Sequence, residues 1–153
     1  MVSWNDVQEF LARLNHLTGK NYRLPTEIEW EFAACGSTAS SGCTYSGSSD
    51  VNDVAWYKKN SRRRSQLVGT KLPNDFGIHD MSGNVGELCE DRFRNNRVVR
   101  GGNFLKAARR SKVTSRMIIR SFSRLDHVGF RVLLPVTSLS TETYTQPSQT
   151  VWD

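Results

Sequence analysis

Apolar residues near the start of the chain recur with the spacing of a helix. They are Val7, Phe10, Leu11, Leu14 and Leu17. A helix turns once every 3.6 residues, so these side chains share one face. Ser3 precedes them as an N-cap with Asp6 in the reciprocal capping position, and Gly19 follows as a left-handed stop. The pattern predicts a first helix that covers a core with one face.

A second helix is predicted almost directly afterwards. Thr26 and Glu29 have the spacing of a capping box, and Gly36 is placed to end the helix. Its buried side is expected to come from Trp30, Phe32, Ala33 and Ala34.

The rest of the chain has weaker periodicity and many turn residues. We expect a short strand or anchoring turn at 54–57, a brief extended stretch at 67–70, and strands at 97–100 and 128–134, the last being the best strand candidate. A glycine pair at 101–102 predicts a bend after the third of these. Residues 36–53 and 77–85 are typical of irregular loops. The pattern therefore indicates an α+β domain over residues 1–135, followed by a Ser/Thr-rich tail over 136–153.

Length and composition fit one globular domain. The chain has 153 residues and no apolar run near the roughly 20 residues that span a bilayer, and no secretory signal is visible at its start. Cys35 and Cys43 could bridge a small loop, or they and Cys89 could be reduced thiols packed as small hydrophobes.

Positive charge is concentrated in the C-terminal half. The net charge is +6, and Asp126 is the only acidic residue between positions 92 and 131. Such a surface could bind nucleic acid or another polyanion. The alternative is a solvated face whose arginines bind backbone carbonyls. We favour this alternative, because aromatic residues are not interleaved with the basic ones as base stacking requires.

Three separated strings resemble the formylglycine-generating-enzyme (sulfatase-modifying-factor) family. They are VSWNDVQEFLARLNHLTGKNYRLPTEIEWEFAA at 2–34, NDFGIHDMSGNVGELCED at 74–91, and RVVRGGNF at 97–104 followed by GFRVL at 129–133. The resemblance implies a C-type-lectin-like fold of this family's type, with two helices, a small, mostly antiparallel sheet and large irregular loops. The family's N-terminal segment has no counterpart here, which suggests a minimal form or a fragment.

The sequence departs from the family's enzymes where their chemistry lies. Those enzymes use a cysteine pair between the RGG and GFR strings to bind copper, whereas this chain has no cysteine there and places Ser111 near that position. A serine hydroxyl is too weak an acid to replace a thiolate. Moreover, His16, His79 and His127 lack the spacing of a histidine trio for iron. We therefore expect no catalysis, with a metal-dependent oxidase relative of altered active site as the alternative.

A non-enzymatic branch of the family gives the leading functional hypothesis. The resemblance is greatest to the variable proteins of diversity-generating retroelements, in which this stretch carries diversified ligand-binding residues. We call residues 105–127 the display segment and expect it to bind a macromolecular ligand, on a virion or cell surface if the chain is such a protein. The expected face comprises Leu105, Lys106, Ala107, Arg110, Ser115, Met117, Ile118, Ile119, Arg120, Phe122, Ser123, Leu125, Asp126 and His127. The strand and bend before this segment and the strand after it should bring its ends together, while Arg116 and Arg124 should bond buried carbonyls or carboxylates.

The resemblance also implies a structural calcium ion. Its ligands would be Asp80, Gly83, Val85 and Glu87, which supply the oxygen atoms that a hard cation prefers. The alternative is that Asp80 and Glu87 accept hydrogen bonds from backbone N–H groups or arginine. Near this loop Gly86 and Leu88 replace the family's two usual tryptophans.

Overall fold

The computed structural model describes residues 1–36 and 44–136. The elements in this part of the chain are α1 (Trp4–Thr18), α2 (Glu27–Cys35), α3 (Val51–Val54), β1 (Ala55–Trp56), β2 (Ser82–Gly83), β3 (Gly86–Phe93), β4 (Asn96–Arg100), the 3₁₀ helix η1 (Ala108–Arg110), β5 (Arg116–Arg120) and β6 (Val128–Gly129). Cys43 and most of the predicted tail lie outside the described residues. No helix in residues 1–36 or 44–136 is long and apolar enough to cross a membrane.

Both predicted helices are confirmed, with their caps. The Ser3 side chain accepts a hydrogen bond from the backbone N–H of Asp6, and Gly19 ends α1 with a φ of 65°. Thr26 and Glu29 form the second capping box, and Gly36 ends α2 with a φ of 68°. These caps satisfy backbone groups that a helix terminus leaves without intrahelical partners.

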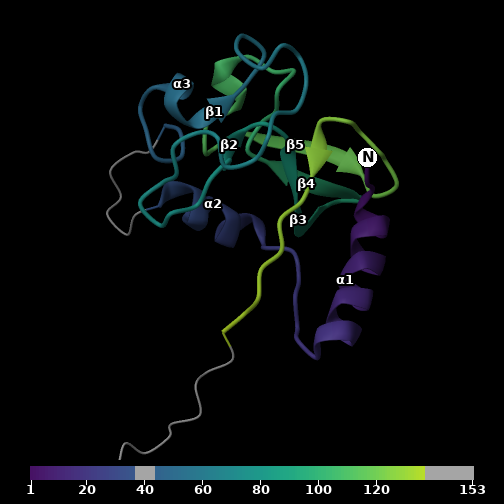
Figure 1. Ribbon diagram of the computed structural model, residues 1–153. Helices are drawn as coiled ribbons and strands as arrows, with labels where there is room; N and C mark the ends of the chain where they lie inside the picture. The colour runs from purple at the N-terminus through teal and green to yellow at the C-terminus, as the bar shows by residue number, and fades with distance from the viewer. Residues whose placement is uncertain (37–43, 137–153) are drawn as a thin grey trace, which may run out of the picture.

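A four-stranded sheet lies between the two long helices, with the strand order β5-β4-β3-β6 (Figure 1). Strand β4 pairs antiparallel with β3 and β5, whereas β6 pairs parallel with β3. Neighbouring residues of a strand point to opposite faces. Accordingly, Leu88 and Val99 share a core cluster with α1, while Cys89 and Val98 share the other cluster with α2.

Several sequence predictions about the strands are wrong. Strand β3 covers residues 86–93, for which the sequence predicted no strand, and β5 covers 116–120, in a segment that was expected to lie on loops. Residues 128–134 form only the two-residue β6 and one bridge, between Leu133 and Arg23, because the chain leaves β3 after Gly129. Residues 67–70 form a turn with Leu67 76% exposed, since no strand lies beside them to pair with.

The buried face of α1 is narrower than the spacing of its apolar residues predicts. Val7 and Leu11 are buried, but Leu17 is 81% exposed because it lies in the last turn of the helix. Phe10 packs edge-on against Phe130, with 5.4 Å between ring centroids.

Candidate ligand-binding site

Two glycines determine how the chain enters and leaves the display segment. Gly102 has a φ of 73°, and a Cβ there would lie 2.0 Å from the carbonyl oxygen of Arg110, so only glycine fits. A Cβ on Gly86 would lie 3.4 Å from the carbonyl oxygen of Gly102 and 3.6 Å from that of His127. The two ends of the segment thus meet over Gly86 in β3, as the sequence analysis expected.

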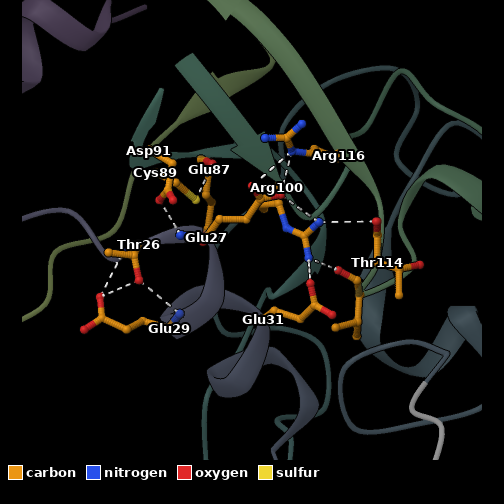
Figure 2. Close-up of polar contacts among 11 residues, drawn as sticks. Thr26, Glu27, Glu29, Glu31, Glu87, Cys89, Asp91, Arg100, Thr114 and Arg116 are labelled. Carbon is orange, nitrogen blue, oxygen red and sulfur yellow. Dashed lines mark hydrogen bonds and ion pairs between the residues drawn. The ribbon is translucent and has the colours of Figure 1, made fainter. Parts of the chain in front are cut away.

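A buried arginine ties the middle of the display segment to α2. The side chain of Arg100, at the end of β4, is 3% exposed. Its Nη2 donates a 2.9 Å hydrogen bond to the carbonyl oxygen of Val113, and its Nη1 donates to that of Thr114 at 3.3 Å. The same guanidinium pairs with Glu31 and lies 3.4 Å from a Glu27 carboxylate oxygen (Figure 2). We call these contacts the Arg100 cluster; they hold residues 113–114 against the helix.

Arg116 and Arg124 do pair with carboxylates, but these pairs are not buried. Arg116 Nε lies 2.7 Å from a Glu27 oxygen, and its side chain is 37% exposed. Arg124 binds both oxygens of Asp6 at 2.8 and 2.6 Å and is 60% exposed. The hydrogen bonds from Arg124 and from the Ser3 backbone hold the pKa of Asp6 well below its ordinary value. The expectation of buried partners for these two arginines is therefore wrong, because both lie near the surface where a helix begins.

The predicted face contains exposed, half-buried and buried residues. The exposed ones are Lys106, Ala107, Arg110, Arg120, Phe122 and Asp126. The half-buried ones are Leu105, Ser115, Met117, Ile118, Ser123, Leu125 and His127. Ile119 is buried, 8% exposed, and belongs to the core cluster under α1, so it cannot be part of an exposed face. Met117 and Leu125 also pack against that cluster, and Ile118 packs against the other one, because β5 contributes to both faces of the sheet.

Most of the remaining members of the face fall into two groups. Lys106, Arg110, Ser115 and Met117 line one pocket. Residues 120–127 instead run past the start of α1, where the carbonyl oxygen of Ser121 accepts a hydrogen bond from Trp4 N at 3.0 Å. The two groups lie toward opposite ends of β5, whose first and last residues are four steps, or about 13 Å, apart along the strand.

The pocket, which we call the Gly86 pocket, has a volume of about 230 Å³. Backbone and apolar side chains form part of its wall, from Gly86, Val99, Gly102 and Met117. The polar lining comes from Asn103, Lys106, Arg110, Ser115 and Arg116, and thus includes three cationic side chains and no carboxylate. The sequence did not indicate Gly86, Val99, Gly102, Asn103 or Arg116 as part of the site. One signal was visible, since Gly86 stands where the family usually has tryptophan.

The described residues offer little for thiol or metal chemistry. Cys89 is a free, buried cysteine, and burial, followed by the charges of Glu87 and Asp91, raises the pKa of its thiol well above the ordinary value. A thiol in that state is a poor nucleophile and a poor copper ligand. Ser111, at the position compared with the copper cysteines, is fully buried. Residues 1–36 and 44–136 contain no group of three or more His, Cys, Asp or Glu side chains that could hold a metal ion.

The residues of the proposed calcium site make other contacts. Arg131 binds both carboxylate oxygens of Glu87, at 2.6 and 2.7 Å, and Trp30 Nε1 donates to the same carboxylate at 2.6 Å. Asp80 accepts from the backbone N–H of Gly69 at 2.7 Å. These hydrogen bonds, from a backbone N–H group to Asp80 and from arginine to Glu87, are the ones that the alternative to a calcium site predicts. The guanidinium of Arg131 already neutralises Glu87, so in this arrangement that carboxylate is not free for a calcium ion.

Comparison with known proteins assigns the chain to a family. The profile of the FGE-sulfatase family, described as the sulfatase-modifying factor enzyme 1-like domain, matches residues 1–136. The chain belongs to this family. The C-type-lectin-like fold predicted from its motifs is confirmed by solved structures of similar fold.

Three relatives illustrate the range of proteins that this FGE-sulfatase chain resembles. Chaperone protein LppX of Paenibacillus barcinonensis is 40% identical over 103 residues, which cover 56% of this chain and 36% of the relative. The inactive C-alpha-formylglycine-generating enzyme 2 of Bos taurus is 31% identical over 160 residues, with coverage of 85% and 48%. Among solved structures, Treponema denticola variable protein 1 is 33% identical with a TM-score of 0.66, and the match covers 74% of this chain and 47% of that one.

The chain spans about a third to a half of the length of these three proteins. Similarity to an inactive enzyme homologue and to a variable protein is consistent with a domain that binds rather than catalyses.

Proposed function

We propose that this domain is a non-catalytic ligand-binding module. Its display segment would present exposed side chains to a macromolecular ligand, as the diversified variable protein of a diversity-generating retroelement does. The observation that carries the proposal is the contrast within this segment between a bonded support and an exposed outer surface.

The support holds the segment without using its exposed side chains. The Arg100 cluster binds backbone carbonyls at 113–114, and the Val113 N–H donates to the carbonyl oxygen of Thr44 at 3.0 Å. Substitution at exposed positions leaves such bonds intact, because exposed side chains contribute little to folding. Phe122 is 63% exposed. A large exposed aromatic side chain of this kind is a typical anchor for a protein partner.

Site-specific photocrosslinking tests the proposal. A photoreactive phenylalanine analogue at position 122 should give a discrete crosslinked product in the cells that carry the gene. The matched control is the same analogue at Leu67, which is exposed and apolar but lies outside the display segment. Equal products from both positions, or none from position 122, would refute a ligand at this surface.

The retroelement assignment has its own test. Sequencing the DNA around the gene should show a reverse transcriptase gene and a near-copy of the codons for residues 97–131. A neighbourhood without either feature would rule out this class while leaving ligand binding itself open to the crosslinking test.

A further inference from the structure

The Gly86 pocket contains two cationic side chains that no acidic residue neutralises. Within residues 1–36 and 44–136, the side chains of Lys106 and Arg110 form no ion pair and no hydrogen bond, although both line the pocket. Arg116, the third cation, is already paired with Glu27. Clustered like charges without partners repel one another, and an anion between them removes that repulsion.

A fixed amide adds a neutral donor to this pocket. Asn103 is 1% exposed, and its Oδ1 accepts a 3.1 Å hydrogen bond from the backbone N–H of Leu105. That bond sets the orientation of the side-chain amide, whose Nδ2 donates no hydrogen bond within the described chain. The pocket thus combines a preset N–H donor with the charges of Lys106 and Arg110, a combination suited to an oxyanion.

The size and the apolar part of the lining narrow the occupant further. Pockets for drug-sized ligands measure about 300–1,000 Å³, whereas this one measures about 230 Å³. It therefore suits a single side chain or a group of that size. Val99 and Met117 provide apolar surface for a short carbon stem next to the charged end.

We propose that the Gly86 pocket binds a carboxylate or similar oxyanion on a short apolar stem, and that it is the anchor site for an acidic side chain of the macromolecular ligand. This inference rests on the proposed function. Lys106 and Arg110 bind the oxyanion, Asn103 donates to it, and Val99 and Met117 contact the stem. Gly86, Val99 and Gly102 belong to the support that holds the segment's two ends together, so this part of the pocket wall is fixed.

The first experiment titrates the ¹⁵N-labelled domain with phenylacetate and, as a matched neutral probe, phenylacetamide. We expect saturable shifts of the amides of residues 102, 106 and 110 with phenylacetate, and at least about tenfold weaker binding of the neutral probe, since a charge-assisted bond is lost. Equal affinity for both probes, or no saturable shift with phenylacetate, would overturn the oxyanion site.

Charge-neutral variants locate the binding groups. Lys106→Gln and Arg110→Gln should each weaken phenylacetate binding by about five- to tenfold, in line with the ~1–1.4 kcal/mol net value of such a bond. Arg109→Gln is the matched control, because Arg109 is exposed on the same short helix and does not line the pocket. An equal loss in Arg109→Gln would mean general attraction to a basic surface and would refute the pocket.

A last comparison separates a side-chain anchor from a small-molecule site. A neutral-flanked peptide with one glutamate should shift the same amides as phenylacetate, whereas binding of the free acid alone would refute the anchor role. If Arg110→Gln leaves the crosslink from position 122 unchanged, the pocket is not the anchor although the proposed function stands. If wild type gives no crosslink, the proposed function itself fails.

Discussion

Residues 113–119 and residues 120–127 belong to the same display segment, yet they differ in how the backbone is held and in which apolar side chains are buried. In the first stretch Val113 is 1% exposed and Ile119 is 8% exposed, and the Arg100 cluster binds the backbone. In the second, Phe122 is 63% exposed. Both stretches mix basic, small and apolar residues, so composition does not distinguish them. Pairing with β4 distinguishes the two stretches, because it places alternate side chains of β5 in the two core clusters. Three changes test this difference, a fourth tests the helix that supports the first stretch, and a fifth tests the predicted calcium site.

The largest effect on stability is expected from removing the Arg100 cluster, which holds the first stretch. Arg100→Ala strands two carbonyls and leaves Glu31 without its partner, and breaking a buried pair costs about 3–5 kcal/mol. Because Glu31 is 45% exposed, we expect the lower end, about 3 kcal/mol, in urea unfolding. The control Arg120→Ala removes an exposed arginine of the same strand pair and should cost under about 0.5 kcal/mol. Similar losses of unfolding free energy in both variants would show that the Arg100 cluster does not hold this stretch.

The next change compares one apolar residue from each stretch. Ile119→Ala should lower the free energy of unfolding by about 2–4 kcal/mol because it opens a cavity under α1. Phe122→Ala should cost less than about 0.5 kcal/mol, since that side chain is already exposed. If Phe122→Ala costs more, the face and its support have been assigned the wrong way round.

A smaller loss of stability is expected at Arg116, which lies between the Arg100 cluster and solvent. Arg116→Ala removes a partner of Glu27, but Glu27 keeps Arg100 nearby at 3.4 Å. Exposed pairs of this kind contribute about 0–1 kcal/mol, so the loss should be under about 1 kcal/mol and should shrink at high salt. A loss as large as that of Arg100→Ala would show that the pair is buried in solution.

Acid should destabilise α2, the helix that carries the carboxylates of the Arg100 cluster. Hydrogen bonds from Arg23, and then from the Thr26 backbone, lower the pKa of Glu29 from 4.5 to about 2. Its stabilising contribution is therefore present above about pH 4.5 and is lost as the pH falls through 2. Thermal melting of Glu29→Gln should show a flatter pH dependence than wild type over this range. Parallel curves would indicate that Glu29 is not the titrating group.

The smallest effect is expected from removing calcium. Because Arg131 and Trp30 already bind Glu87, a chelator should leave the melting temperature unchanged within about one degree. A melting temperature that rises on adding calcium to the chelated domain would restore the predicted site at Asp80–Glu87.

Local interactions explain what could be predicted from the sequence. The two residues of each capping box are three positions apart, Ser3 and Asp6 in one and Thr26 and Glu29 in the other, so the spacing is visible in the sequence itself. The glycine stops at Gly19 and Gly36 are similarly local. The three family strings, in order, then identified the fold.

Long-range contacts decided the rest. Arg100 and Glu31 are 69 residues apart, and Trp30 and Glu87 are 57 apart, so no local pattern indicates either pair. The burial of Ile119 likewise depends on its register with Arg97 in β4. The sequence by itself determined the two long helices, their ends and the family. Only the tertiary structure decided which part of the display segment is support and which is surface, because burial depends on neighbours that are distant along the chain.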